Sequence, residues 1–479
     1  MGNLRRFDRR NMIFLLIFTV FFGYLYVTGE PVYAGDTFQY ENQMIMREPV
    51  YALLMQFCRF LSPQNHYQLI ILFQNILAVV ANTAVLAFMR KRFRLNMGIS
   101  LLLAGILLVP HVMTPVFAST HLVLTNTLMT EGILFSLYPL AFVCLLDMMW
   151  SGKPIGKKSF GTLAFFWLIS LIRGQMMVLF VVWFLAAFVL AVRNGAAVTK
   201  RTQTGVDTFV LAENIGRQGL VAILAAVVIV FVARSVVIHV YNYCEQGLFV
   251  DTASGKAMSF ANVLYVADRE DGAAIADDGL RTLFYEIYDR ADADQMNYKY
   301  APSGILDRAA HHEACHDELN FTYFSDAARE YVGERQGIYA DTYQELMIAL
   351  DEVADALSAE LMPKVFGRYV LNYINVIAVG FVRTVAYENT VLAWYAVCIY
   401  IAAVALTVVL WRRNPASMAA SFMAVVLLTI VGNVCATALM IQCISRYMIY
   451  NLPLFYMAGL LELRELKELS ERHGRQDGI

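Results

Sequence analysis

Residues 218–241 read QGLVAILAAVVIVFVARSVVIHVY, an apolar run interrupted by Arg234 and His239. A helix needs about 20 mostly apolar residues to cross the hydrocarbon core of a bilayer. This run is therefore long enough to span a membrane. Further candidate spans cover residues 11–28, 66–89, 97–116, 124–149, 159–172, 175–193, 391–411, 417–440 and 444–462.

The composition agrees with these runs. Hydrophobic residues make up 59% of the chain and the mean hydropathy is +0.54, whereas soluble domains are about 45–50% apolar. We therefore predict an all-α polytopic membrane protein with about ten transmembrane helices. The chain has no Gly-rich phosphate loop and no GxGxxG motif, so neither an ATP-driven pump nor a nucleic-acid partner is indicated.

Basic residues predict the orientation of the spans, because cytoplasmic connections carry an excess of Lys and Arg. Alternate connections hold 21 of the 37 basic residues, which places both termini in the cytoplasm and suggests the plasma membrane. These residues are Arg5, Arg6, Arg9, Arg10, Arg90, Lys91, Arg92, Arg94, Lys153, Lys157, Lys158, Arg193, Lys200, Arg201, Arg217, Arg412, Arg413, Arg464, Lys467, Arg472 and Arg475.

The stretch 242–365 differs from the rest. It holds 24 of the 39 acidic residues and 9 basic ones, a net charge of about -15, and it contains no span. We predict a mainly helical external domain there, between an N-terminal module of seven spans (1–241, with the first external loop at 29–65) and a C-terminal module of three (391–462). Residues 366–390 are apolar but carry Arg368 and Arg383, so we predict an interfacial or re-entrant element. Residues 463–479 form a cytoplasmic tail.

The first apolar run has two interpretations. Basic residues, an apolar core and Val32-Tyr33-Ala34 resemble a signal peptide with its cleavage site. We favour a helix that is retained, because polar residues with catalytic character follow it at once.

Charged residues inside a membrane span are costly and usually functional. In this chain the charged residues instead gather at the external ends of the predicted spans. A carboxylate placed there can serve as general base for a hydroxyl. Arginines can hold a phosphate through forked, charge-assisted bonds. Four separate regions contribute: Gly35-Asp36-Thr37-Phe38-Gln39-Tyr40 with Arg47-Glu48-Pro49-Val50-Tyr51, Thr130-Glu131-Gly132, Leu171-Ile172-Arg173-Gly174, and Ser445-Arg446-Tyr447 with Pro453.

On these motifs the chain resembles the GT-C membrane glycosyltransferases, the group that includes protein O-mannosyltransferases and lipid A aminoarabinose transferases. The resemblance covers roughly 11–193 and 391–462. It implies a site over the external membrane face and a polyprenyl-phosphate sugar donor, with transfer to a glycan, lipid or protein acceptor. The chain departs from many members in having Gly174 after the Arg, and no paired Asp-x-Asp follows the first span. A role for a divalent metal therefore stays open.

The resemblance implies a role for each candidate site residue. Asp36 corresponds to the family's first-loop acidic residue, the proposed base of an inverting transfer. The remaining residues would bind the donor phosphate or the substrates: Tyr40, Arg47, Glu48, Glu131, Arg173, Arg446 and Tyr447.

Two other classes of function stay open. A transporter or flippase of lipid-linked saccharides would use the same polar residues, although transporter sites usually lie near the bilayer midplane. His312-Glu313-Ala314-Cys315-His316 matches HExxH, whose two His bind zinc in metallopeptidases. Asp317 and Glu318 follow the motif where zinc peptidases have uncharged residues. We therefore expect a solvated acidic helix, with His312 and His316 as weak metal candidates only.

Overall fold

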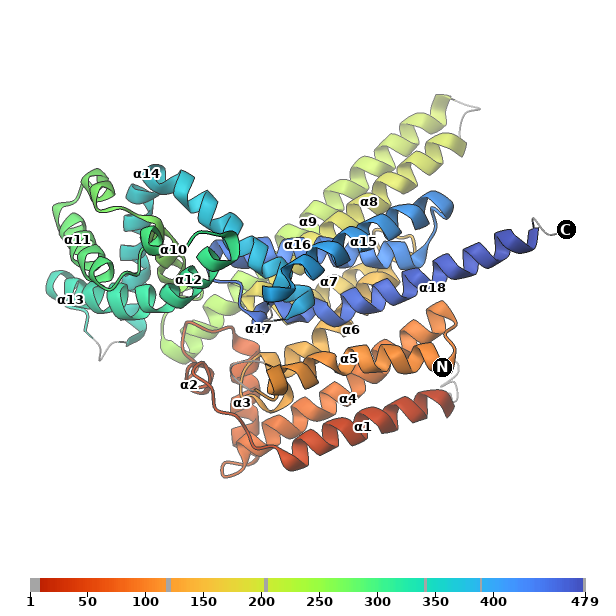
Figure 1. The fold of residues 1–479 in the computed structure, drawn as a ribbon, viewed down its shortest axis with the longest axis horizontal. Coiled ribbons are helices and arrows are strands. Elements are labelled where there is room, and N and C mark those ends of the chain that lie inside the picture. The colour runs from red at the N-terminus through yellow and green to blue at the C-terminus, as the bar shows by residue number, and fades with distance from the viewer. Residues whose placement is uncertain (1–8, 118–121, 202–205, 340–342, 388–389, 477–479) are drawn as a thin grey trace.

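The computed structural model describes residues 9–117, 122–201, 206–339, 343–387 and 390–476 (Figure 1). Within these ranges every regular element is a helix, apart from an isolated parallel bridge between Val32 and Thr127. Arg5 and Arg6, two of the basic residues used to predict orientation, lie outside the described residues.

Within the described ranges, nine helices are long and apolar enough to cross a membrane. The prediction of an all-α, multi-pass integral membrane protein is thereby confirmed. The nine are α1 (Arg9–Thr28), α4 (His66–Phe93), α5 (Met97–Phe117), α6 (Glu131–Trp150), α8 (Val178–Arg201), α9 (Val206–Gln246), α14 (Tyr343–Ala386), α15 (Ala393–Arg413) and α16 (Met418–Met440).

Two predicted spans fall outside this set. The segment 159–172 lies in α7 (Lys157–Ser170), which has only 14 residues. The segment 444–462 starts with two short turns, α17 (Ser445–Met448) and η8 (Ile449–Asn451), before α18 (Leu452–Gln476) begins. α18 nevertheless packs along α16, α5 and α15, and it continues without a break into the segment that we predicted as a tail.

The segment 366–390 is not a separate element. α14 runs continuously from Tyr343 to Ala386, so the chain does not reverse direction within those residues. Figure 1 shows α14 changing direction between its two halves, and Pro363 lies inside the helix. The second half packs against residues near the end of α16 and against α17. Its depth relative to a membrane remains a prediction.

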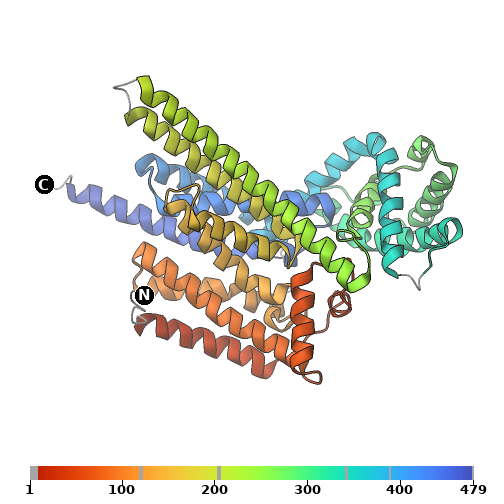
Figure 2. The same ribbon diagram turned by 180° about the vertical axis from the view of Figure 1, so that it is seen from behind.

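The two ends of the bundle differ. Figures 1 and 2 both show the two chain ends on one side of the bundle and the domain containing α10 to α13 on the other. This arrangement agrees with the predicted separation of the termini from the acidic domain. Which side faces the cytoplasm is not a property of the fold alone.

The acidic stretch forms a helical domain with a hydrophobic core of its own, which includes Phe260, Phe284, Phe324 and Leu350. Asp268 and Asp271 of this domain pair with α14, since Arg368 contacts both. Its helices are α10 (Gly255–Val266), η3 (Arg269–Ala274), α11 (Asp278–Ala293), η4 (Tyr298–Tyr300), α12 (Ile305–Glu318), η5 (Leu319–Phe324) and α13 (Ser325–Gln336).

Two short helices follow α1. They are α2 (Thr37–Glu41) and α3 (Pro49–Leu61), and both views show α3 running across the ends of α1 and α4 (Figures 1 and 2). α3 buries Tyr51 and Met55 and exposes Phe57 and Phe60. An amphipathic helix that lies across the ends of spans suits the membrane–water interface.

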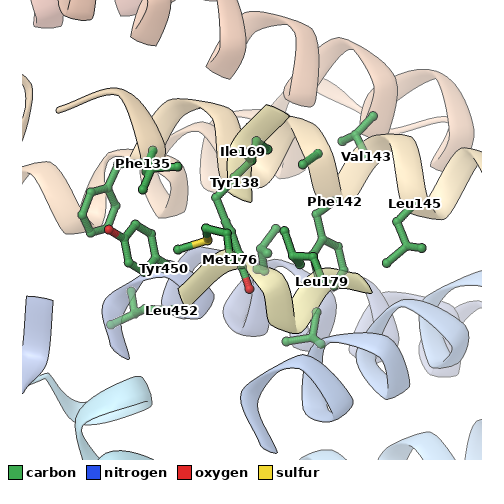
Figure 3. Packing of buried hydrophobic residues seen from close by; sticks show 14 of the residues in the cluster. Phe135, Tyr138, Phe142, Val143, Leu145, Ile169, Met176, Leu179, Tyr450 and Leu452 are labelled. Atoms are coloured by element: carbon green, nitrogen blue, oxygen red, sulfur yellow. The ribbon is translucent and has the colours of Figure 1, made fainter. Parts of the chain in front are cut away.

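Aromatic side chains form the core next to the segment that carries Arg446 and Tyr447. Tyr450 stacks on Phe135, with ring centroids 4.4 Å apart, and Tyr138 donates a hydrogen bond to Asn451 at 2.8 Å. Figure 3 shows Met176 and Leu452 packed into the same layer. This layer ties α6 to the segment that carries Arg446 and Tyr447.

Candidate active site

Asp36 lies between two arginines from distant parts of the chain. One carboxylate oxygen is 2.8 Å from an Arg47 nitrogen, and the other is 3.8 Å from an Arg446 nitrogen. Asp36 precedes α2, but its side chain makes no capping hydrogen bond to that helix. The carboxylate is therefore not occupied by the structural role that an Asp before a helix usually has.

Arg173 and Glu131 form a second pair at 2.6 Å. Arg173 lies in extended backbone between α7 and η2 (Gly174–Met177) and also donates to Thr130 at 3.1 Å. Glu131 opens α6 and is buried. Its neighbour Gly132 packs against Gln74, and a Cβ at Gly132 would displace the amide group of that side chain. Glycine in the Thr-Glu-Gly motif therefore leaves room for the buried Gln74 amide beside the carboxylate.

Tyr447 joins the two pairs. The guanidinium carbons of Arg173 and Arg446 lie 4.7 Å and 4.9 Å from the centre of its ring, and Arg446 donates to its hydroxyl at 2.8 Å. Gln175 and Asn433 each donate to its backbone carbonyl at 3.0 Å. These bonds fix Tyr447 between the arginines.

Tyr40 supports the Arg47 side of the site. Arg47 lies over its ring at 5.2 Å, and Tyr51 packs against it edge-on. Burial raises the pKa of Tyr40 to about 12, although Arg47 acts in the opposite direction. The phenol therefore keeps its proton at neutral pH and can donate a hydrogen bond.

Glu48 lies at the edge of this cluster with a partner of its own. It pairs with Arg234 of α9 at 3.2 Å, and both side chains are largely buried. Gly174 leaves room for the carboxylate, because a Cβ there would lie 2.6 Å from a Glu48 oxygen. Gly174, which differs from the residue that many GT-C members have after the Arg, thus leaves room for an internal ion pair. This pair also explains the charged side chain of Arg234 within an apolar helix.

The structure brings all eight predicted site residues into one neighbourhood. Glu48 and Arg234 form a separate pair at the edge. In the rest of the site, the guanidiniums of Arg47, Arg173 and Arg446 contact two carboxylates, those of Asp36 and Glu131. Three positive charges therefore face two negative ones. Buried polar atoms beside them have no hydrogen-bond partner among the described residues: Gln175 Oε1, Ser445 Oγ, Arg446 Nε, Tyr450 OH and Asn451 Nδ2. Such atoms leave hydrogen-bonding capacity for a bound anion or substrate.

An apolar groove of about 750 Å³ lies between α5, α15 and α18. Ile106, Met113, Ala403 and Phe455 are among its lining residues, and so is Leu452, which directly follows Asn451 in the chain. The groove is lined mainly by apolar side chains. Its chemistry suits a hydrocarbon chain.

The HExxH motif has other partners. The prediction of a solvated helix is wrong for this part of α12, because His312 and His316 are buried. His312 bonds Asn262 at 2.8 Å. Glu313 pairs with Arg383 at 2.6 Å. No group of three His, Cys, Asp or Glu residues that could hold a metal ion occurs among the residues that the structure describes. The eight predicted site residues, called the polar cluster from here on, include three carboxylates, those of Asp36, Glu48 and Glu131. Each of these carboxylates already contacts an arginine, so they do not fit a site for a divalent cation.

Comparisons with family models, curated proteins and solved structures found no match. The resemblance to GT-C enzymes therefore stays a prediction from the sequence motifs.

The sequence did not single out several residues that shape the site. Gln175 and Asn433 hold the Tyr447 backbone carbonyl, and Tyr450 lies near Arg173 and Arg446. The available signal was a polar side chain within an apolar run, as Asn433 is within α16.

Proposed function

We propose that the chain is an inverting membrane glycosyltransferase of the GT-C type. It would transfer a sugar from a polyprenyl-phosphate donor to a glycan, lipid or protein acceptor at the external face. The observation that carries the proposal is the Asp36 carboxylate held between Arg47 and Arg446, at the end of a membrane bundle that also contains an apolar groove.

The donor would bind in two parts. Its polyprenyl chain would occupy the apolar groove, and its phosphate would contact Arg446 and Arg173 above Tyr447. Guanidiniums bind phosphate oxygens in forked pairs. The excess of one positive charge in the cluster favours an anion there.

Phosphate binding would also free the base. A donor phosphate competes with Asp36 for Arg47 and Arg446, because both anions bind the same guanidinium donors. The carboxylate would then accept a proton from the acceptor hydroxyl. The hydroxyl oxygen forms a bond to the anomeric carbon, the bond from that carbon to the phosphate oxygen breaks, and polyprenyl phosphate leaves with the electron pair. Attack opposite the leaving group inverts the anomeric centre.

Purified protein tests the proposal directly. We expect polyprenyl-phosphate lipid to co-purify and to be detected by mass spectrometry. A supplied polyprenyl-phosphate sugar should yield a glycosidic product and free polyprenyl phosphate. Movement of lipid-linked sugar across a vesicle membrane without bond formation would instead support the transporter alternative. Peptide cleavage that requires zinc and His312 would support the peptidase alternative.

A further inference from the structure

The domain formed by residues 242–365 contacts the loop that carries Arg47. Ile45, two residues earlier, is fully buried in the hydrophobic core of that domain. Its carbonyl accepts a hydrogen bond from the Ala253 N–H at 3.1 Å, and its N–H donates to Gln344 at 3.3 Å. Gln246 donates to the carbonyl of Gln43 at 3.0 Å. The loop is thus anchored in the domain just before the arginine.

The same domain reaches the loop that carries Arg446. Arg383 of α14 pairs with Glu313 of α12 at 2.6 Å and donates to the Cys443 carbonyl at 3.0 Å. Gln442 donates to Asp317 of α12 at 3.0 Å. Cys443 is three residues before Arg446 in the chain. The second anchor thus lies three residues before its arginine, and the first lies two residues before Arg47.

The two loops come from nearly opposite ends of the sequence, and Asp36 contacts an arginine from each. The separation of Arg47 from Arg446 consequently depends on what holds the loops relative to each other. The 242–365 domain contacts both. The 3.8 Å contact from Asp36 to Arg446 is the more sensitive one, because it is already at the outer limit of an ion pair.

We propose that the 242–365 domain is a positioning domain, which sets the spacing of Arg47 and Arg446 through Ile45 on one side and the Glu313–Arg383–Cys443 bridge on the other. Glu313 of the HExxH motif thereby acts as an ion-pair partner in this bridge. The consequence for catalysis rests on the proposed function, but the coupling of the domain to the two loops does not.

Thiol labelling tests the coupling without any enzymatic assay. Cys443 and Cys315 are both buried, and none of the seven cysteines forms a disulfide. Two single-cysteine forms of the full chain, one with Cys443 and one with Cys315, would be labelled with a maleimide. Arg383→Gln should speed labelling of Cys443 by about tenfold relative to Cys315, because losing a charge-assisted bond favours local opening.

The matched control is Asp289→Asn, which breaks a half-exposed pair with Arg269 in the same domain. It should change neither rate. The proposal would be overturned if the ratio of Cys443 labelling rate to Cys315 labelling rate stayed unchanged in both Arg383→Gln and Glu313→Gln. An equal rise in both labelling rates leaves this ratio unchanged and would also overturn it. Arg383→Lys, which keeps the charge, should give an intermediate ratio.

A transfer assay tests the consequence. Glu313→Gln should raise the donor KM by about three- to tenfold with a smaller change in kcat, because displaced Arg446 binds the phosphate less well in ground and transition state alike. It should have no further effect in an Arg446→Ala background. Full additivity of the two changes would contradict positioning through Arg446. Failure of the wild-type chain to transfer sugar would reject the proposed function and leave the labelling result standing.

Discussion

The Asp36 carboxylate and its two arginines come from sequence positions that no local pattern connects. Asp36 and Arg47 are 11 residues apart, whereas Arg446 lies near the other end of the chain. Each could be selected from the sequence because charged residues gather at the external ends of the predicted spans. The sequence could not predict that Asp36 contacts Arg47 at 2.8 Å and Arg446 at 3.8 Å. These contacts depend on how α1, α3 and α18 pack.

Replacing Arg446 tests phosphate binding at the level of one side chain. We expect Arg446→Ala to raise the donor KM by about 10- to 100-fold, with kcat changed less, because the arginine would contact the phosphate before and during transfer. Arg446→Lys should recover only part of the loss, since lysine lacks the planar fork. Steady-state kinetics with purified donor would measure both. A normal KM in Arg446→Ala would exclude this residue from donor binding.

Partners of the charged residues were harder to predict than the residues themselves. From the sequence alone, Arg234 could be interpreted either as a site residue or as one member of an internal ion pair. The structure pairs it with Glu48, from a loop far away in the chain. Tyr40 illustrates the same limit, because its burial between Arg47 and Tyr51 arises only from tertiary packing.

Among the elements, α14 and α18 departed most from expectation. Because of Arg368 and Arg383, we predicted a separate interfacial or re-entrant element after residue 365. Both arginines lie on the continuous helix α14 and pair with acidic residues of the 242–365 domain, Asp268 and Asp271 for the first and Glu313 for the second. Hydropathy cannot reveal such pairing, because the partners lie far away in sequence.

The helix α12 should make stability depend on pH. Burial, and secondarily His316, hold the pKa of His312 well below its usual value of 6.5. The unfolded state therefore binds more protons than the folded state once the pH falls below about 6.5, and stability decreases as the pH falls further. The contribution is at most about 1.4 kcal/mol per pH unit.

His312→Gln isolates this contribution, because glutamine can still donate a hydrogen bond to Asn262. We expect the apparent melting temperature of the full chain to fall less steeply between pH 7 and pH 5 in His312→Gln than in the wild type. Thermal unfolding in detergent, followed by circular dichroism, would measure both slopes. Equal slopes would mean that His312 titrates normally in the folded protein.

At the scale of the whole molecule, the apolar runs predicted most of the architecture. Eight of the ten predicted spans coincide with candidate membrane helices, and α14 is the ninth. The termini lie opposite the acidic domain, as the alternation of basic connections requires (Figure 1). The core of the domain and its contacts with two site loops had no counterpart in the sequence pattern.

Orientation in the membrane can be measured with two engineered cysteines. Asp278 is 88% exposed in the acidic domain and Lys467 is 78% exposed near the C-terminus. In a Cys244→Ser background, an impermeant maleimide should label Asp278→Cys in intact cells and Lys467→Cys only after permeabilisation. The reverse pattern would place the polar cluster on the cytoplasmic face.

Asp36 is proposed as the base of a glycosyl transfer. Asp36→Asn keeps the size and hydrogen-bonding capacity of the side chain but removes the charge that accepts a proton. With a defined polyprenyl-phosphate sugar and purified protein, we expect the transfer rate to fall by about 10²–10⁴, the range for positioned acid–base groups. Expression and retention of donor lipid should persist. Near-normal transfer by Asp36→Asn would contradict the account and move the search for the base to Glu131 or Glu48.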